Sequence, residues 1–230
     1  MLELIKRLLA LFLNRKGATV DIPSTPIPTV TPVSTTPSEP IISSPPVVDT
    51  FSTVVLPLTL IFEGGFSDNP SDHGGRTNKG IIQVVYDKYR IKKGLPPADV
   101  KDITNDEVRD IYYNDYYLAS QCDKMPEKLS VVVFDTSVNS GPGRSIKTLQ
   151  QAIGAHVDGV IGQETLSKLK SYDPMALANS FLTARNVFYN KIVENDPTQQ
   201  VFLKGWLRRW GFVRDYVNGV KTLDQIRKEW

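Results

Sequence analysis

The alternation of apolar and polar positions predicts a mainly helical protein. Thr104 and Glu107 have the spacing of a capping box before an apolar stripe. Gly141 and Gly154 follow later apolar stripes, as glycines that end helices do. The segments with helical periodicity are 103–120, 125–141, 145–154, 173–195 and 200–217. We therefore expect one helical body with short turn-rich excursions.

The first 17 residues also alternate at helical spacing. Leu2, Ile5, Leu9 and Phe12 recur on one side, with charged residues between them. The uninterrupted apolar run is far shorter than the ~20 residues that a membrane-spanning helix needs, and no convincing cleavage site follows. We expect an amphipathic helix over 1–17 that either lies on an anionic membrane surface or docks on protein.

Residues 18–50 have neither helical nor strand periodicity. Eight of the chain's 16 prolines fall in this segment, among many serines and threonines. Such a composition buries too little apolar surface to offset the entropy of ordering it. We predict a disordered linker, with the folded body beginning near Phe51.

Composition and cysteine usage exclude several classes of function. A formal net charge of +2 over 230 residues gives no field that argues for nucleic acid. Cys122 is the only cysteine, which excludes an intrachain disulfide and a thiolate zinc site. His73 and His156 are the only histidines, so we expect no metal and no cofactor. A nucleophilic Cys122 lacks a surrounding signature, and we interpret it as an inert thiol.

Glu63 is the first candidate for chemistry. It ends the apolar segment 54–62 and precedes Gly64 and Gly65, which predicts that it lies at the C-terminus of a buried helix. The helix dipole and the apolar neighbours both disfavour its carboxylate form, so its pKa should rise. A carboxyl group that stays protonated can act as a general acid, as glycoside hydrolysis requires. The alternative is a solvated glutamate before a helix cap.

The segment after Glu63 contains the partners that such a reaction needs. Turn signals between residues 64 and 80, followed by a tight turn and a short strand, can fold the chain back across Glu63. Asp72 and Thr77 lie on this excursion and could hold a water across the cleft. Asp68 and Asn69 are interpreted as turn residues, and His73 as a loop residue in contact with solvent or a turn carbonyl.

Several segments resemble a known family in order along the chain. These are "EGGFSDNPSDHGGRTNKGI", "ITNDEVRDIYYNDYY", "VVVFDTSVNSGPGRSIKTLQQAIG", "VDGVIGQETL" and "FLKGWLRRW". Together they resemble glycoside hydrolase family 108, the N-acetylmuramidases found as phage endolysins and bacterial secretion-associated muramidases. The resemblance implies a mainly α, lysozyme-like fold and hydrolysis of the β-1,4 bond from N-acetylmuramic acid to N-acetylglucosamine, with bacteriolysis as the outcome.

The resemblance also implies residue roles and a domain organisation. The family's catalytic glutamate maps onto Glu63, and the spacing to Asp72 and Thr77 is similar to that of phage-type lysozymes. Asn78 is assigned to substrate binding. Together with the segments described above, the expected arrangement is a helix (1–17), a linker (18–50), a body (51–218, with a catalytic part 51–135 and a peptidoglycan-binding-like part 136–218) and a tail (219–230). The Asp-Gly turn at Asp158 is structurally just a turn before a helix.

Three further polar or aromatic residues are candidates for the saccharide groove. Asp135 and Asn139 share one helix face and either line the groove or form a buried polar pair. Trp206 and Trp210 also share a face, for which we favour core packing of Trp206 and substrate contact by Trp210. The basic and aromatic mixture around them fits single-stranded nucleic acid only superficially.

We therefore expect a monomeric peptidoglycan hydrolase with Glu63 as general acid. One alternative is a lytic transglycosylase, which would use Glu63 alone and give an anhydro product. Another is a non-catalytic peptidoglycan-binding or secretion accessory protein. We expect synthesis in the cytoplasm and action on the cell wall, reached through a holin or by carriage in a virion, with peripheral membrane association through 1–17.

Overall fold

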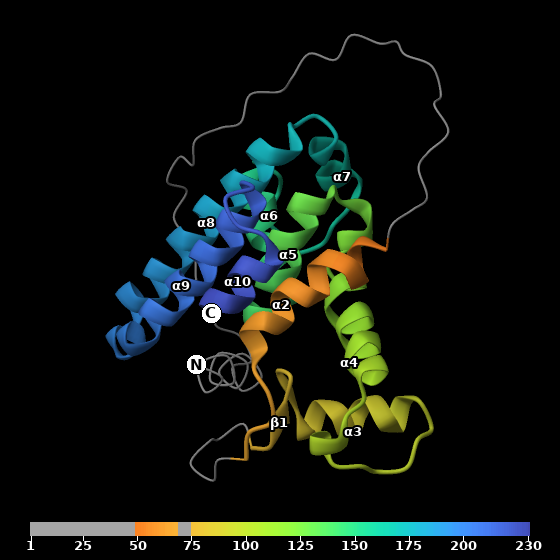
Figure 1. Ribbon diagram of the computed structural model, residues 1–230. Helices are drawn as coiled ribbons and strands as arrows, with labels where there is room; N and C mark the ends of the chain where they lie inside the picture. Colours follow the sequence, from red (N-terminus) through yellow and green to blue (C-terminus); the bar gives the residue numbers. More distant parts are fainter. Residues whose placement is uncertain (1–48, 69–74) are drawn as a thin grey trace.

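The computed structural model describes residues 49–68 and 75–230, which form a mainly helical body. In Figure 1 the hairpin and α3 lie below the other helices, and α4 runs between the two regions. The elements are η1 (Phe51–Val55), α2 (Leu56–Glu63), β1 (Thr77–Asn78), β2 (Ile81–Ile82), α3 (Gln83–Lys92), η2 (Val100–Asp102), α4 (Asn105–Tyr112), η3 (Tyr113–Leu118), η4 (Cys122–Lys124), α5 (Glu127–Ser140), α6 (Pro142–Ala152), α7 (Gln163–Leu169), α8 (Pro174–Asn195), η5 (Pro197–Gln199), α9 (Gln200–Val217) and α10 (Leu223–Glu229). The mainly α fold class is confirmed. The expectations for 1–17, and for most of the linker 18–50, lie outside the described residues.

Helix α5 is the centre of the body. Every residue from Leu129 to Ser140 is buried, and α5 packs against α6, α8 and α9. A helix that is apolar or buried on all sides must lie inside a protein rather than on its surface. The buried polar residues of α5, including Asp135 and Asn139, therefore need partners from the surrounding helices.

Local signals set the limits of several helices as expected. Thr104 and Glu107 form the predicted capping box of α4, and a second box at Thr222 and Gln225 begins α10. Helix α5 ends at Gly141 (φ 84°), and Gly154 (φ 63°) follows α6. Pro57 does not break the first apolar segment, because it lies at the start of α2, directly after the π-helical turn η1.

The predicted tight turn and short strand form a two-stranded antiparallel hairpin. Thr77 pairs with Ile82 and Asn78 with Ile81, and Lys79 and Gly80 make the turn between them. The helix α3, which begins directly after Ile82, was not predicted, because the β-branched residues Ile81, Ile82, Val84 and Val85 resemble a buried strand as much as a helix start.

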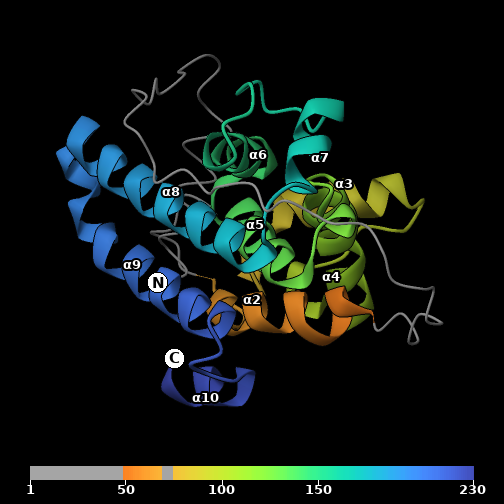
Figure 2. The same cartoon turned by 90° about the horizontal axis from the view of Figure 1, so that it is seen from above.

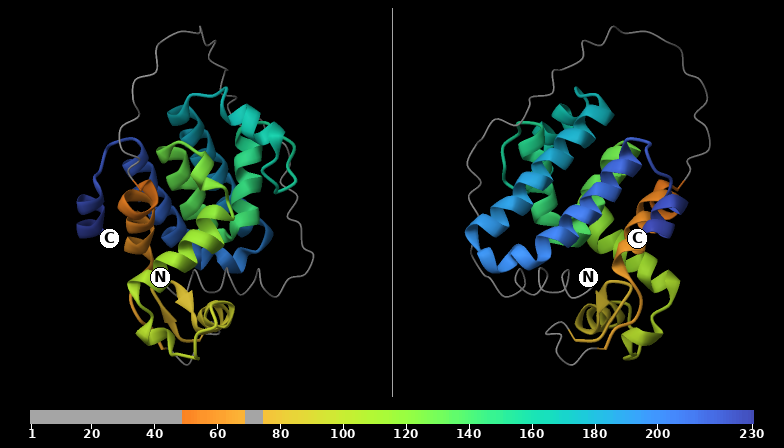
Figure 3. Two further views of the ribbon diagram at one scale, coloured as in Figure 1. Left: turned by 90° about the vertical axis from the view of Figure 1, so that its right-hand side faces the viewer. Right: turned by 60° about the vertical axis from the view of Figure 1, so that its left-hand side comes forward.

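The last three helices pack across the body. Figure 2 shows α8 and α9 lying side by side, and both views of Figure 3 show α10 next to α2. Residues 219–230, expected only as a tail, thus fold onto the core, and Ile226 in α10 is fully buried. The expected division of the body between residues 135 and 136 falls inside α5, so it marks no break in the structure.

Candidate active site

Glu63 is the last residue of α2, as the sequence predicts. Gly64 follows it with a φ of 71°, a conformation that favours glycine and ends the helix. The Glu63 side chain is fully buried. Beside it, Phe62 packs edge-on against Trp230 with ring centroids 4.8 Å apart, which braces the end of α2 from the side of α10.

The hairpin turn packs directly on the Glu63 carboxyl group. Lys79 (φ 48°) and Gly80 (φ 78°) both have positive φ, as a two-residue type I′ turn requires. A Cβ atom on Gly80 would lie 2.6 Å from Glu63 Oε2 and would also overlap the Tyr112 hydroxyl. That hydroxyl donates a hydrogen bond of 2.8 Å to the Lys79 carbonyl and fixes the turn. Only glycine therefore fits where the turn meets Glu63.

Arg209 in α9 reaches the same carboxyl group from the opposite end of the sequence. Its Nη1 donates to Glu63 Oε1 at 2.7 Å. Its Nε and Nη2 donate to Asp135 Oδ1 at 2.9 and 2.7 Å. Arg185 Nη1 in α8 lies 2.7 Å from Asp135 Oδ2. Two carboxylates and two guanidinium groups thus form a buried ionic chain that joins α2, α5, α8 and α9.

The second oxygen of Glu63 has a different environment. Oε2 is buried and has no hydrogen-bond partner among the described residues. A buried oxygen without a partner is costly as a carboxylate but tolerable as a protonated hydroxyl that awaits an acceptor. Glu63 is therefore arranged with one oxygen occupied by Arg209 and the other available.

The electrostatics of the cluster separate its two carboxyl groups. Burial raises the pKa of Glu63, and Asp135 adds to the rise, although Arg209 opposes it. The expected direction is confirmed, with burial as the main cause. Burial acts upward on Asp135 too, but Arg209 and Arg185 together hold its pKa below the ordinary value. Glu63 therefore retains a proton more readily than Asp135 does.

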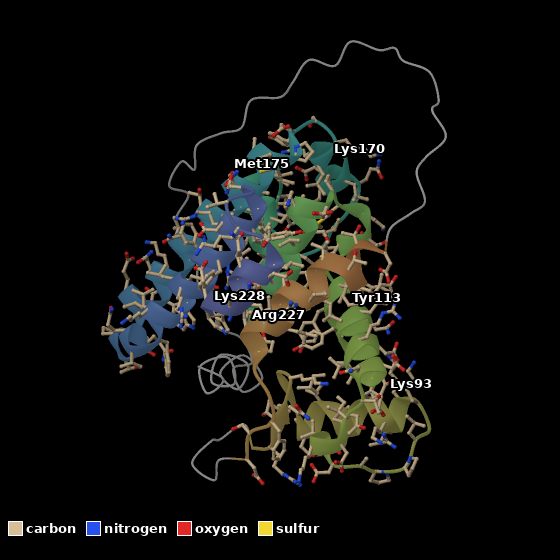
Figure 4. All side chains as sticks on the ribbon, viewed as in Figure 1. Lys93, Tyr113, Lys170, Met175, Arg227 and Lys228 are labelled. Carbon is tan, nitrogen blue, oxygen red and sulfur yellow. The ribbon has the colours of Figure 1, made fainter. Side chains whose placement is uncertain are left out.

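A cavity of about 480 Å³ lies between α3, the end of α4 with η3, and the corner where α5 meets α6. Tyr116 lines it, and its ring centroid is 5.5 Å from that of Tyr112, whose hydroxyl fixes the turn beside Glu63. Burial and the charge of Glu63 raise the pKa of Tyr116 to about 12, so the tyrosine stays neutral. Asn139 and Ser140 from α5 also line it, as does Lys93, which follows α3 and lies near the end of α4 in Figure 4.

Two residues expected to bind substrate have structural hydrogen-bond partners. The Asn78 amide donates to the carbonyls of Val100 and Lys101 at 3.2 and 2.9 Å and ties the hairpin to η2. The Trp210 indole donates to the Leu182 carbonyl at 2.8 Å, at the edge of the core. Both side chains hold elements together in this arrangement.

The remaining candidates divide between the cluster and the cavity. Asp135 is engaged by two arginines, which is the buried polar alternative considered for it. Asn139 lines the cavity and accepts from Tyr189 at 2.8 Å. Thr77 is buried in β1, where its hydroxyl donates to the Gly75 carbonyl at 3.2 Å. Asp72, Asn69 and His73 lie outside the described residues.

Three structural interpretations from the sequence are confirmed. Trp206 is 2% exposed and belongs to the core. Cys122 is buried, and burial raises the pKa of its thiol, as expected for an inert cysteine. Asp158 makes a local turn, in which its carboxylate accepts from Gln150 and from the Val160 amide.

The residues that the sequence did not reveal are Arg209, Arg185, Tyr112 and Gly80. Arg209 occupies one stripe of α9 with the buried residues Trp206, Val213 and Val217. A charged residue within an apolar stripe indicates a buried partner. That signal was present in the sequence, but nothing local identified the partner.

Within the described ranges, no group of histidine, cysteine and carboxylate side chains could hold a metal ion. The same residues include no helix long and apolar enough to cross a membrane.

Comparisons with known proteins show the family of the chain. Residues 56–141 match the model of the family described as glycosyl hydrolase 108, and residues 144–210 match a predicted peptidoglycan domain. A search of curated proteins finds no match. A solved structure described as that of SagA from Brucella abortus is similar with a TM-score of 0.62 and 30% identity, over 74% of this chain and 94% of that one. The protein is a glycoside hydrolase that acts on peptidoglycan, and the chain belongs to the glycosyl hydrolase 108 family.

Proposed function

We propose that the enzyme hydrolyses the β-1,4 bond between N-acetylmuramic acid and N-acetylglucosamine, with Glu63 as the general acid. The observation that carries this proposal is the divided environment of the Glu63 carboxyl group. Arg209 donates to Oε1, whereas buried Oε2 has no partner among the described residues. The proton of the neutral acid thus resides on Oε2, from which it passes to the leaving glycosidic oxygen.

The carboxylate that remains after proton transfer is stabilised by a charge already in place. Arg209 lies 2.7 Å from Oε1 and needs no rearrangement when Glu63 becomes negative. Such prepositioned charges are among the largest contributions to catalysis. The raised pKa of Glu63 thus keeps the proton in place before transfer, and Arg209 stabilises the carboxylate after transfer.

We assign the attacking water to Thr77 and Asp72. The Thr77 hydroxyl donates to the Gly75 carbonyl, which leaves its oxygen able to accept a hydrogen bond from water. Asp72 belongs to the same excursion after Glu63 and would act as the base across the sugar. Asp135 does not suit this second role, because two guanidinium groups already neutralise it.

The cavity bounded by Tyr116 and Asn139 is the proposed entrance for the glycan. Its volume and its mixture of aromatic and amide side chains suit sugar rings, which stack on aromatic faces and exchange hydrogen bonds with amides. Glu63 has no exposed surface in this conformation, so binding must displace part of the chain that covers it.

Lytic transglycosylation is the second candidate, because it requires one acid and the structure offers Glu63 beside a neutralised Asp135. In that reaction Glu63 acts first as acid and then as base, and the substrate's own hydroxyl attacks. The two reactions leave different muramic acid ends.

Mass spectrometry of fragments released from purified peptidoglycan tests the proposal. Reducing muramic acid ends from the wild type, absent with Glu63→Gln, are the expected result. Anhydro ends would assign the enzyme to the transglycosylases. Reducing N-acetylglucosamine ends would contradict the proposed identity of the cleaved bond. Unchanged fragment release by Glu63→Gln would contradict the role of Glu63 as general acid. Full activity of Asp72→Ala would remove Asp72 from the mechanism.

Association with a membrane surface through residues 1–17 remains part of the proposal. The charged and apolar alternation of that segment supports it. Sedimentation with anionic vesicles, compared between the full chain and a chain lacking 1–17, is the test. Equal sedimentation would end the idea.

A further inference from the structure

Arg209 and Arg185 belong to the segment matched by the peptidoglycan domain, not to the one matched by the glycosyl hydrolase family. We propose that Arg209 is a positioning residue that directs the Glu63 proton to Oε2, and that Asp135 and Arg185 regulate how strongly Arg209 acts on Glu63. This inference rests on the proposed role of Glu63 as proton donor. It makes the second segment a part of the catalytic centre as well as a binding element.

The first step of the argument is the direction of the hydrogen bonds. A guanidinium group carries only donors, so the Arg209 Nη1 bond of 2.7 Å requires Glu63 Oε1 to accept. A proton on Oε1 would compete with this bond. The neutral form of Glu63 is therefore the tautomer with its proton on Oε2, beside Gly80 and the Tyr112 hydroxyl.

The second step is the fixed orientation of Arg209. Two of its nitrogens, Nε and Nη2, donate to Asp135 Oδ1, which sets the plane of the guanidinium group. Arg185 holds the other oxygen of Asp135, and Arg185 Nε in turn donates to the Tyr189 hydroxyl at 2.7 Å. All of these side chains are buried, so no solvent replaces a lost partner. Asp135 thus fixes the orientation of Arg209, and only the Nη1 nitrogen remains to bind Glu63.

The third step is the balance of charge. Glu63, Asp135, Arg185 and Arg209 sum to zero when Glu63 is ionised. Removing the charge of Arg209 disfavours the Glu63 carboxylate, whereas removing the charge of Asp135 leaves more of the Arg209 charge for Glu63. The two substitutions must therefore shift the pKa of Glu63 in opposite directions.

Few other titratable groups face Glu63 from the elements packed against it. Tyr112 in α4 and Tyr116 in η3 are neutral near pH 7, because burial raises the pKa of both. In the hairpin turn, Gly80 carries no charge and the Lys79 ammonium group donates to Asn105 Oδ1. Thr59 from α2 contacts Asp135 rather than Glu63. Arg209 and Asp135 are the charged groups that act on Glu63 within the described part of the chain.

The test is a carboxyl ¹³C NMR titration of Glu63 in the full chain, for the wild type and the variants Arg209→Met and Asp135→Asn. We expect the pKa of Glu63 to rise in Arg209→Met and to fall in Asp135→Asn. The alkaline limb of the kcat/KM profile should move with it, because that limb reports loss of the acid's proton. Arg214→Met, which removes an exposed arginine of the same helix, should change neither.

Two further variants keep the test decisive. Arg209→Lys retains the positive charge but lacks the guanidinium group. The pKa of Glu63 in this variant should lie close to the wild-type value, while kcat should be about tenfold below that of the wild type because the groups are misplaced. If Asp135→Asn does not fold, the double variant Asp135→Asn/Arg185→Met removes one charge of each sign and is titrated in its place. A smaller fall in the same direction is expected, because Asp135 acts on Glu63 directly whereas Arg185 pairs with Asp135.

Opposite shifts with Arg214→Met unchanged support the inference. Shifts in one direction, or none in folded variants, overturn it. The titration does not depend on turnover, so opposite shifts in a protein that leaves peptidoglycan intact would refute the proposed function and leave the charge coupling standing.

Discussion

Glu63 and Arg209 are 146 residues apart in the sequence, yet Arg209 Nη1 lies 2.7 Å from Glu63 Oε1 in a fully buried ion pair. The contact joins the last residue of α2 to the middle of α9. Burial of a carboxylate is unfavourable unless it is paired. The partner that makes a buried acid possible at the end of α2 is thus supplied by a helix far along the chain.

Replacing Glu63 with glutamine should abolish catalysis and alter the pH dependence of stability. Loss of a positioned general acid reduces kcat by roughly 10²–10⁴-fold. The folded-state pKa of Glu63 is raised above its ordinary value of 4.5, so its contribution to stability is complete below pH 4.5 and is lost as the pH rises through the folded-state pKa. Urea unfolding at pH 4 and pH 8 should show Glu63→Gln gaining stability relative to the wild type with rising pH. A constant difference would mean that the pKa is not raised.

Gly80→Ala should damage both stability and activity. A left-handed backbone costs roughly 1–2 kcal/mol for a residue with a Cβ atom, and this Cβ would lie 2.6 Å from Glu63 Oε2. Displacement of the acid should lower kcat by about 10²-fold. Gly94→Ala is the matched control, because Gly94 has a similar φ of 67° and no atom of the described residues lies within 4 Å of its added Cβ. Equal effects of the two substitutions would show that the turn does not position Glu63.

Tyr112→Phe should loosen the hairpin turn without disturbing the core. The lost hydroxyl leaves the Lys79 carbonyl without its 2.8 Å bond, which costs about 1 kcal/mol. We expect a modest fall in kcat, since the turn borders Oε2 of Glu63. Tyr113→Phe, at a half-exposed ring on the next position, serves as control for thermal unfolding and rate. Identical behaviour of the two variants would leave Tyr112 without a role.

The sequence identified the parts of the site that depend on local signals. Glu63 lies at a helix end because Gly64 takes a φ of 71°, and the capping box of Thr104 and Glu107 begins α4 as expected. These features depend on residues within one or two turns. Local hydrogen bonding and backbone sterics are sufficient to predict them.

The contacts that complete the site depend on tertiary packing. No sequence pattern near Asp135 distinguishes a residue that lines a groove from one that is buried between two arginines. The sequence likewise did not reveal that the half-buried Trp210 indole donates to the Leu182 carbonyl of a neighbouring helix. The helix α10, which was not predicted, has its own capping box, but its apolar face is buried only because it packs against α2.

Trp230→Ala should weaken the support of helix α2. The indole packs on Phe62 at 4.8 Å and on Phe212 at 5.7 Å, and Arg208 lies 4.7 Å from its ring centroid. In Figure 4, Arg227 and Lys228 mark α10 next to α2. We expect a loss of roughly 1–3 kcal/mol in the free energy of unfolding, with some loss of activity because Phe62 precedes Glu63. Trp230→Phe should retain most of both, and an unaffected Trp230→Ala would mean that α10 does not brace α2.

The buried ionic chain should also determine how the protein unfolds in acid. Arg209 and Arg185 lower the folded-state pKa of Asp135 below 3.8, so its contribution to stability is present above pH 3.8 and is lost as the pH falls through the lower value. At neutral pH, Asp135→Asn leaves buried Arg185 without a carboxylate, which should cost about 3–5 kcal/mol. Adding Arg185→Met should recover part of that loss, because the unpaired charge is removed. Denaturant unfolding of both single variants and the double variant measures the coupling. Additive losses would contradict the ion pair between Asp135 and Arg185. A double variant that is less stable than either single variant would show that the two side chains stabilise the fold by more than the compensation of their charges.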